Sequence, residues 1–167
     1  MPTLDDNGFY LSESHAILPY LANAYGKDDF LYPKDPKARY LVDQRLAFNL
    51  GTLYQRFLNA SMPSVLAKAP IDPGNIEKLN EALQFTNVFL AKSKYIAGDQ
   101  FTIADIAVLM SLISLECVHY DISSFPAVTN YLQKLKGEVK GYDELVKTCA
   151  DGLAEWFHHM NPSFSWK

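Results

Sequence analysis

Apolar residues recur at helical spacing from residue 35 to the end of the chain. The clearest stripe has steps of four and three residues, which places its members on one face of a helix. Its members are Val42, Leu46, Leu50, Leu53 and Phe57. Asp35-Pro36 predicts where this helix begins, because Asp is a good N-cap and Pro suits the first helical position. Comparable patterns predict further helices over residues 75–92, 102–118, 126–137 and 142–160.

The first 26 residues have a different pattern. Two short apolar segments, Pro2–Leu4 and Phe9–Leu11, predict strands, and the Asn7-Gly8 pair between them favours a tight hairpin turn. A helix is predicted from Ser14. The fold class is therefore an α-rich α+β fold. We expect a β-β-α unit over residues 1–26, a polar linker over 27–34, and an all-helical domain of about five helices over 35–167.

The turn between the second strand and this first helix contains Ser12, Glu13 and Ser14. The start of a helix has free backbone N–H groups, which attract anions, and the Glu13 carboxylate can bind an amine. The turn can therefore hold both ends of a zwitterion such as a free amino acid or a small peptide. The alternative is that Ser12 or Ser14 is only an N-cap.

Thr102 and Asp105 have the spacing of a capping box, in which each side chain accepts a hydrogen bond from the backbone N–H of the other residue. Phe101 and Ile106 flank the box at the positions of a hydrophobic staple. A cap of this kind stabilises a helix by about 1 kcal/mol without any ligand, so we interpret it as a folding element.

Charge and composition exclude several function classes. A net charge of −4 does not favour nucleic-acid binding, and no apolar run reaches the length of a membrane span. The N-terminus lacks the pattern of a signal peptide. Cys117 and Cys149 lie far apart in helical segments, so we expect buried thiols and a cytoplasmic protein. His158 and His159 are adjacent and would point to different sides of a helix, so we expect no metal site.

Several motifs together resemble the cytosolic glutathione S-transferases, in particular the insect delta/epsilon class. They are the Pro2-Thr3-Leu4 strand, the hairpin, Glu13-Ser14 and the segment from Ala97 to Ala107. The segments Val42–Leu46 and Gly51–Tyr54 look like the same class. The resemblance covers the whole chain and implies a partial thioredoxin-like domain followed by the helical domain of that family.

The resemblance assigns a glutathione-binding role to Met1, Glu13, Ser14 and His15. In the family, the residue before a cis-proline pairs its backbone with the cysteinyl unit of glutathione, and here that residue is Met1. The Glu-Ser pair holds the γ-glutamyl end. The next residue is commonly Arg in delta enzymes and is His15 here, which would make its contact with an anion weaker or dependent on pH.

In the family, the electrophile binds in an apolar pocket between helices. The corresponding candidates here are Tyr54, Phe57, Met62 and Leu66, although Phe57 and Leu66 taken alone also fit a plain core role. The aromatic C-terminal segment from Trp156 to Trp166 is expected to close over this pocket.

In delta/epsilon enzymes, a serine ahead of the cis-proline stabilises the glutathione thiolate. Its position would precede residue 1, so no catalytic residue is assigned in this chain. We expect glutathione, as co-substrate, to be conjugated to hydrophobic electrophiles in detoxification by a homodimer, with activity impaired because that serine is missing. The alternatives are a non-catalytic carrier of apolar ligands, a dimer partner, or a structural domain of a larger assembly.

Overall fold

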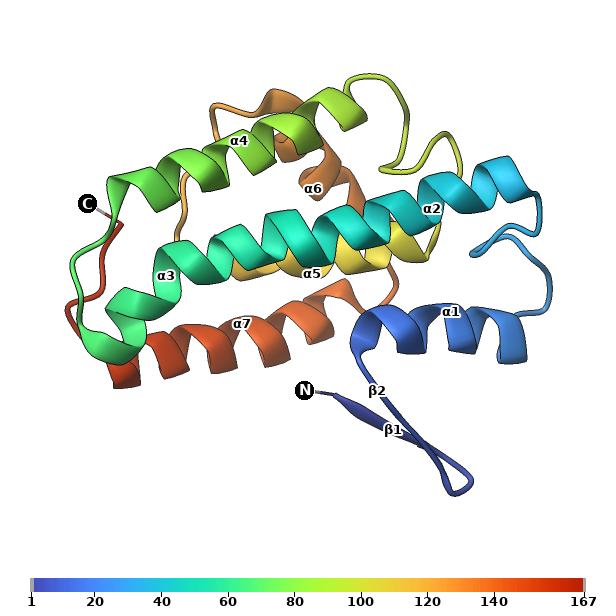
Figure 1. The fold of residues 1–167 in the computed structure, drawn as a ribbon, viewed down its shortest axis with the longest axis horizontal. Coiled ribbons are helices and arrows are strands. Elements are labelled where there is room, and N and C mark those ends of the chain that lie inside the picture. Colours follow the sequence, from blue (N-terminus) through green and yellow to red (C-terminus); the bar gives the residue numbers. More distant parts are fainter. Residues whose placement is uncertain (1, 167) are drawn as a thin grey trace.

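The computed structural model describes residues 2–166, and over residues 145–149 it describes the backbone alone. The fold is mostly helical: a two-stranded hairpin and a short helix come first, and a bundle of longer helices follows (Figure 1). The hairpin projects from the bundle beside the first helix. The predicted α-rich fold class and the order of its two parts are confirmed. The prediction for Met1 lies outside the described residues.

The hairpin pairs β1 (Thr3–Asp6) with β2 (Phe9–Ser12) in antiparallel register. Asn7 and Gly8 make the turn with φ angles of 54° and 90°. Both residues tolerate this left-handed backbone, and such a turn matches the natural twist of the two strands. The sequence pair that predicts the hairpin therefore also explains its geometry.

The next helix, α1 (Ser14–Tyr25), holds the hairpin against the rest of the molecule. The hydroxyls of Tyr20 and Tyr25 both donate hydrogen bonds to the carboxylate of Asp6 at the hairpin tip. These hydrogen bonds, chiefly that of Tyr20, lower the pKa of Asp6. Ile17 is the buried residue of α1. The helix α1 itself packs against α5 (Ile103–Cys117), the central helix of the bundle.

The longest helix of the bundle has three consecutive parts: α2 (Pro36–Phe48), η1 (Asn49–Tyr54) and α3 (Gln55–Ala67). Asp35 caps its start, since its carboxylate accepts hydrogen bonds from two N–H groups of the first turn at 3.1 and 2.9 Å. The middle part, η1, is a π-helical turn, with hydrogen bonds that span five residues instead of four. Such turns are rare and are frequently found at functional sites.

One residue of the predicted apolar stripe is misplaced. Leu50 is 45% exposed, whereas its neighbour Asn49 is only 1% exposed. The buried side chains along this part of the helix are therefore those of Leu46, Asn49 and Leu53. The prediction that Leu50 lies on the buried face is wrong, because the polar residue Asn49 takes the buried position at this turn of the helix.

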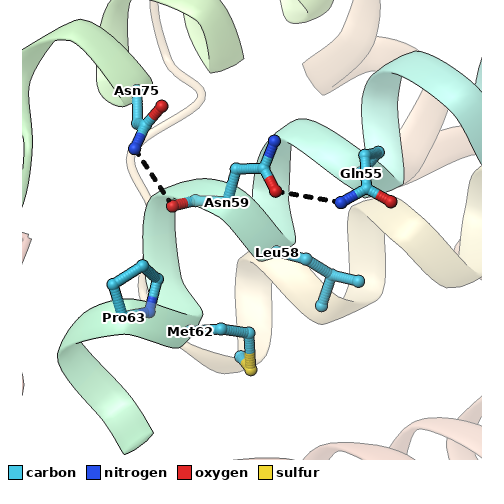
Figure 2. Close-up of a pocket in the computed structure, with 6 residues that line it drawn as sticks. All are labelled: Gln55, Leu58, Asn59, Met62, Pro63 and Asn75. Atoms are coloured by element: carbon cyan, nitrogen blue, oxygen red, sulfur yellow. Dashed lines mark hydrogen bonds between the residues drawn. The ribbon is translucent and has the colours of Figure 1, made fainter. Parts of the chain in front are cut away.

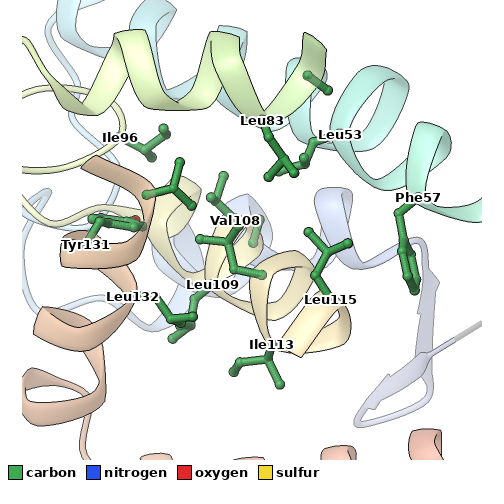
Figure 3. Close-up of a cluster of buried hydrophobic side chains, with 14 of the residues drawn as sticks. Leu53, Phe57, Leu83, Ile96, Val108, Leu109, Ile113, Leu115, Tyr131 and Leu132 are labelled. Atoms are coloured by element: carbon green, nitrogen blue, oxygen red, sulfur yellow. The ribbon is translucent and has the colours of Figure 1, made fainter. Parts of the chain in front are cut away.

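Four more helices complete the bundle: α4 (Pro73–Leu90), α5 (Ile103–Cys117), α6 (Pro126–Glu138) and α7 (Tyr142–Met160). Counting the long helix as one, the described part of this domain has the five helices that the pattern predicts. α5 is the central helix and packs against α1, the long helix, α6 and α7. Figure 3 shows its buried side chains between those of the neighbouring helices. Those labelled on α5 are Val108, Leu109, Ile113 and Leu115.

The start of α5 is fixed by a fully buried carboxylate. The capping box of Thr102 and Asp105 is present, with the Thr102 N–H donating to Asp105 Oδ2 at 2.8 Å. Asp105 Oδ1 also accepts hydrogen bonds from the Ile96 N–H at 2.9 Å and the Tyr131 hydroxyl at 2.6 Å. Burial raises the pKa of Asp105, and the hydrogen bonds from Tyr131 and the backbone oppose that rise. Asp105 therefore joins α5, the preceding loop and α6.

Within the described residues, no helix is long and apolar enough to cross a bilayer, and no cluster of three or more His, Cys, Asp or Glu residues is arranged to hold a metal ion. Cys117 is half-buried at the end of α5. The side chain of Cys149 lies outside the described residues.

Asp105→Ala should destabilise the fold much more than loss of an exposed cap. It removes a cap and leaves buried donors unpaired, so the free energy of unfolding should fall by roughly 3–5 kcal/mol. The matched control is Asp35→Ala, which removes an exposed aspartate cap and should cost about 1 kcal/mol. Urea unfolding followed by circular dichroism measures both. Equal losses in the two variants would contradict the role given to Asp105.

Candidate functional site

A cavity of about 700 Å³ lies where α1, the long helix and α5 meet; we call it the inner cavity. Its polar end is the start of α1, with Glu13, Ser14 and His15. Most of its remaining wall is apolar. The apolar and aromatic lining residues are Pro2, Leu18, Leu50, Tyr54, Leu58, Ile106, Ala107 and Met110. The structure thus brings Glu13, Ser14, His15 and Tyr54, four of the residues predicted from the sequence, into one cavity.

The polar end is built by the turn that enters α1. Glu13 has a φ angle of 68°, an unfavourable conformation for a residue with a side chain, of a kind that often occurs at functional sites. Its carbonyl accepts hydrogen bonds from the N–H groups of Ala16 and Ile17, both at 2.9 Å. No described group accepts a hydrogen bond from the N–H of Ser14 or His15. These two donors can hold a carboxylate, beside the Glu13 carboxylate that can hold an amine.

His15 connects this polar end to the interior through Asn49. The Asn49 amide donates to the Ala107 carbonyl at 3.2 Å and accepts from the Ser111 hydroxyl at 2.9 Å. The Ala107 carbonyl can only accept, so it fixes which end of the amide carries the N–H₂ group. That group, at Nδ2, lies 3.1 Å from His15 Nε2. Since Nδ2 can only donate, Nε2 must accept, and His15 is neutral with its proton on Nδ1.

Burial also favours the neutral form of His15. It lowers the pKa of the imidazole, and the nearby Glu13 carboxylate opposes this shift. The proton on Nδ1 faces the Ser14 hydroxyl at 3.4 Å, a long contact. His15 therefore contributes a neutral, positioned ring to the cavity.

The candidates for the apolar pocket separate into three groups. Tyr54 lines the inner cavity, and Met62 lines a shallower depression beside it, which we call the outer groove (Figure 2). The structure does not bring Phe57 or Leu66 to either. Phe57 lies on the core face of the helix, 2% exposed and stacked on Phe157 with ring centroids 6.3 Å apart. Leu66 lies near the end of α3, where 58% of it is exposed.

The C-terminal segment does not close over the inner cavity, contrary to expectation. The Trp166 indole N–H donates to the Val118 carbonyl at 2.8 Å, and its ring lies 4.8 Å from Tyr120 and 6.4 Å from Phe57, between centroids. No described residue of this segment lines the inner cavity. Its aromatic side chains instead pack against the core between the start of α3 and the end of α5, because Phe57 and Tyr120 provide aromatic partners there.

Sequence reasoning missed Asn49, and it named no residue of α5 although the family resemblance implies that this helix lines the electrophile pocket. A polar residue in step with Leu46 and Leu53 is the signal that could have identified Asn49. In α5, apolar residues occur on every side, so periodicity does not show which side faces a cavity. Within α5, only the polar residues Ser111 and Ser114 and the flexible Met110 indicate the side that faces the cavity.

His15→Gln should reduce the dependence of stability on pH. Because the folded pKa of His15 is lowered below its usual 6.5, stability is fully present above pH 6.5 and falls as the pH decreases below it. Gln keeps an acceptor for Asn49 but does not titrate, so the fall between pH 7.5 and pH 5.5 should become smaller. Urea unfolding at several pH values measures it. His159→Gln, at an exposed position of α7, is the control for loss of an imidazole.

Comparisons with known proteins show the family of this chain. A family model described as the C-terminal domain of glutathione S-transferase matches residues 55–138. A glutathione S-transferase from Anopheles gambiae is 45% identical over 159 residues, which cover 94% of this chain and 73% of that protein. The chain therefore spans about three quarters of the length of this relative.

Solved structures extend the likeness to the whole fold. A delta-class glutathione transferase from Nilaparvata lugens is 47% identical and superposes with a TM-score of 0.92, over 96% of this chain and 75% of that one. An epsilon-class glutathione S-transferase from the housefly Musca domestica is 37% identical with a TM-score of 0.86, over the same shares of the two chains. On these matches the chain belongs to the glutathione S-transferase family, in its insect delta/epsilon class.

Proposed function

We propose that this chain binds glutathione as co-substrate and takes part in its conjugation to hydrophobic electrophiles, a detoxification reaction. One observation carries the proposal: the inner cavity combines a polar end suited to a zwitterion with an apolar wall suited to an electrophile. The Glu13 carboxylate would hold the γ-glutamyl ammonium group. The free N–H groups of Ser14 and His15 would hold the adjacent carboxylate. A glutathione transferase from Bombyx mori, 44% identical to this chain, has been solved in complex with the ligand GTT.

The polar and apolar parts of the cavity suggest a direction for the bound molecules. Glutathione held by its γ-glutamyl end at α1 would extend towards Tyr54 and Met110, where the electrophile finds apolar surface. Met110 adapts its shape easily, so this wall can accept electrophiles of different outlines. The Met1 backbone would pair with the cysteinyl unit, as the family resemblance implies.

The proposal includes the organisation of the chain. Residues 1–26 are a partial thioredoxin-like, glutathione-binding domain, 27–34 a linker, and 35–167 the helical domain. The linker is tied to the helical domain, because the Leu31 carbonyl accepts a hydrogen bond from the Ile103 N–H at 3.0 Å at the start of α5. We also propose a cytoplasmic homodimer.

No catalytic residue is proposed. The attacking species in this chemistry is the glutathione thiolate, which needs a donor to stabilise it. Two hydroxyls of the inner cavity are already used, since Ser111 donates to Asn49 and Ser114 donates to the Met110 carbonyl. We therefore propose impaired turnover. This observation also favours a second candidate function, a carrier that binds apolar ligands in the inner cavity without converting them.

Glu13→Gln should weaken glutathione binding while leaving the fold intact. The loss of a charged partner for the ammonium group should raise the dissociation constant about tenfold or more, as measured by isothermal titration calorimetry. Glu155→Gln, at an exposed site on α7, is the matched control and should bind as the unmodified chain does. If glutathione gives no saturable heat with the unmodified chain, the glutathione site is refuted.

Conjugation of glutathione to 1-chloro-2,4-dinitrobenzene separates the transferase from the carrier. The chain alone should turn over this substrate far more slowly than a delta-class enzyme assayed beside it, because the Ser111 and Ser114 hydroxyls of the inner cavity already donate to other groups. Fusion to the strand-helix-strand unit of that enzyme should raise the rate. Equal turnover by the bare chain and the delta-class enzyme would contradict impaired catalysis, and binding of an apolar dye unaffected by glutathione would favour the carrier.

A further inference from the structure

The outer groove adjoins the inner cavity and shares two lining residues with it. Gln55 and Leu58 line both, and Asn59, Met62, Pro63 and Asn75 complete the outer groove. The groove has a volume of about 440 Å³. Figure 2 shows it along α3, with the start of α4 opposite. Gln55 and Leu58 therefore form the boundary that a molecule longer than the inner cavity would cross to reach the outer groove.

The groove presents amide groups whose hydrogen-bonding capacity is only partly used. Gln55 Nε2 donates to Asn59 Oδ1 at 2.9 Å, and Asn75 Nδ2 donates to the Asn59 carbonyl at 3.2 Å. These bonds hold the three side chains in place (Figure 2). Within the described residues, Gln55 Oε1 and Asn75 Oδ1 remain available as acceptors and Asn59 Nδ2 as a donor.

None of the described residues that line the outer groove is charged. The nearest cation in sequence, Arg56, does not line the groove, and its Nη1 donates to Glu81 at 2.6 Å and to the Lys78 carbonyl at 2.7 Å. A carboxylate placed in the groove would gain no opposite charge from the residues that line it. A neutral group with both a donor and an acceptor loses less water and finds matching partners.

We propose that the outer groove is a specificity subsite for uncharged, hydrogen-bonding tails. The favoured ligands are elongated neutral molecules with an apolar body in the inner cavity and a carboxamide or carbamate in the outer groove. Asn59 Nδ2 donates to the tail carbonyl, and Gln55 Oε1 or Asn75 Oδ1 accepts its N–H. Leu58 and Met62 cover the methylene chain between the two ends. This inference rests on the proposed function, since it takes the inner cavity as the electrophile site.

Three naphthalene probes that differ only at the tail end test the proposal. They are 5-(2-naphthyl)pentanamide, its apolar isostere 2-(5-methylhexyl)naphthalene, and the charged 5-(2-naphthyl)pentanoate. Naphthalene fluorescence gives each dissociation constant without glutathione, so failure of glutathione binding does not affect the result. The unmodified chain should bind the amide more tightly than the pentanoate.

The double variant Gln55→Leu, Asn59→Leu removes the amides that face the tail. It should weaken binding of the amide relative to the apolar isostere by about five- to tenfold, the effect of one or two hydrogen bonds. Asn59→Asp keeps the acceptor for Gln55 and removes the free donor, so it should give part of this effect. Asn130→Leu, at an exposed site on α6, is the matched control and should leave the ratio unchanged. Circular dichroism checks that each variant is folded.

An unchanged ratio in both the double variant and Asn59→Asp would overturn the subsite. The same shift in Asn130→Leu would also overturn it, because the effect would then not come from the groove. Failure of all three probes to bind the unmodified chain would overturn it as well. Glutathione binding that depends on Glu13 could still be observed in each of these cases, which keeps the two proposals separable.

Discussion

The buried amide of Asn49 is the interaction on which the inner cavity depends. Asn49 belongs to the long helix, and its hydrogen bonds reach His15 of α1 and Ala107 and Ser111 of α5. A buried polar group must keep all its partners, because an unpaired donor or acceptor away from water costs about 1–3 kcal/mol. Any shift of one helix breaks at least one of these bonds. The amide therefore fixes the relative positions of the three elements that enclose the cavity.

Local chemistry allowed much of the fold to be predicted. Asn7-Gly8, Asp35-Pro36 and the Thr102–Asp105 box each have a conformational preference strong enough to be recognised without the rest of the chain. The polar end of the cavity could be predicted for the same reason, since a turn into a helix presents free N–H groups wherever it occurs. In these cases a few residues that are neighbours in the sequence are sufficient to predict the local structure.

The apolar part of the cavity could not be predicted in the same way. Phe57 and Tyr54 are both aromatic and lie on the same helix, yet one is in the core and the other lines the cavity. Which side faces the core depends on where α5 and the C-terminal segment pack, and these are contacts between residues far apart in the sequence. The outer groove also depends on such a contact, because Asn75 of α4 bonds to the backbone of Asn59 on α3.

The π-helical turn at Asn49–Tyr54 has a consequence for how this chain can vary. In an α-helix each residue advances the direction of the side chains by about 100°, so an inserted or deleted residue would rotate everything beyond it. A π-helical turn accommodates one residue more than a regular turn without that rotation. The wide turn thus divides the long helix into two segments that can change independently. Asn49 and its partners fix the position of the first segment, and the residues of α3 form the second. Evolution could retain the first and remodel the second to suit new ligands.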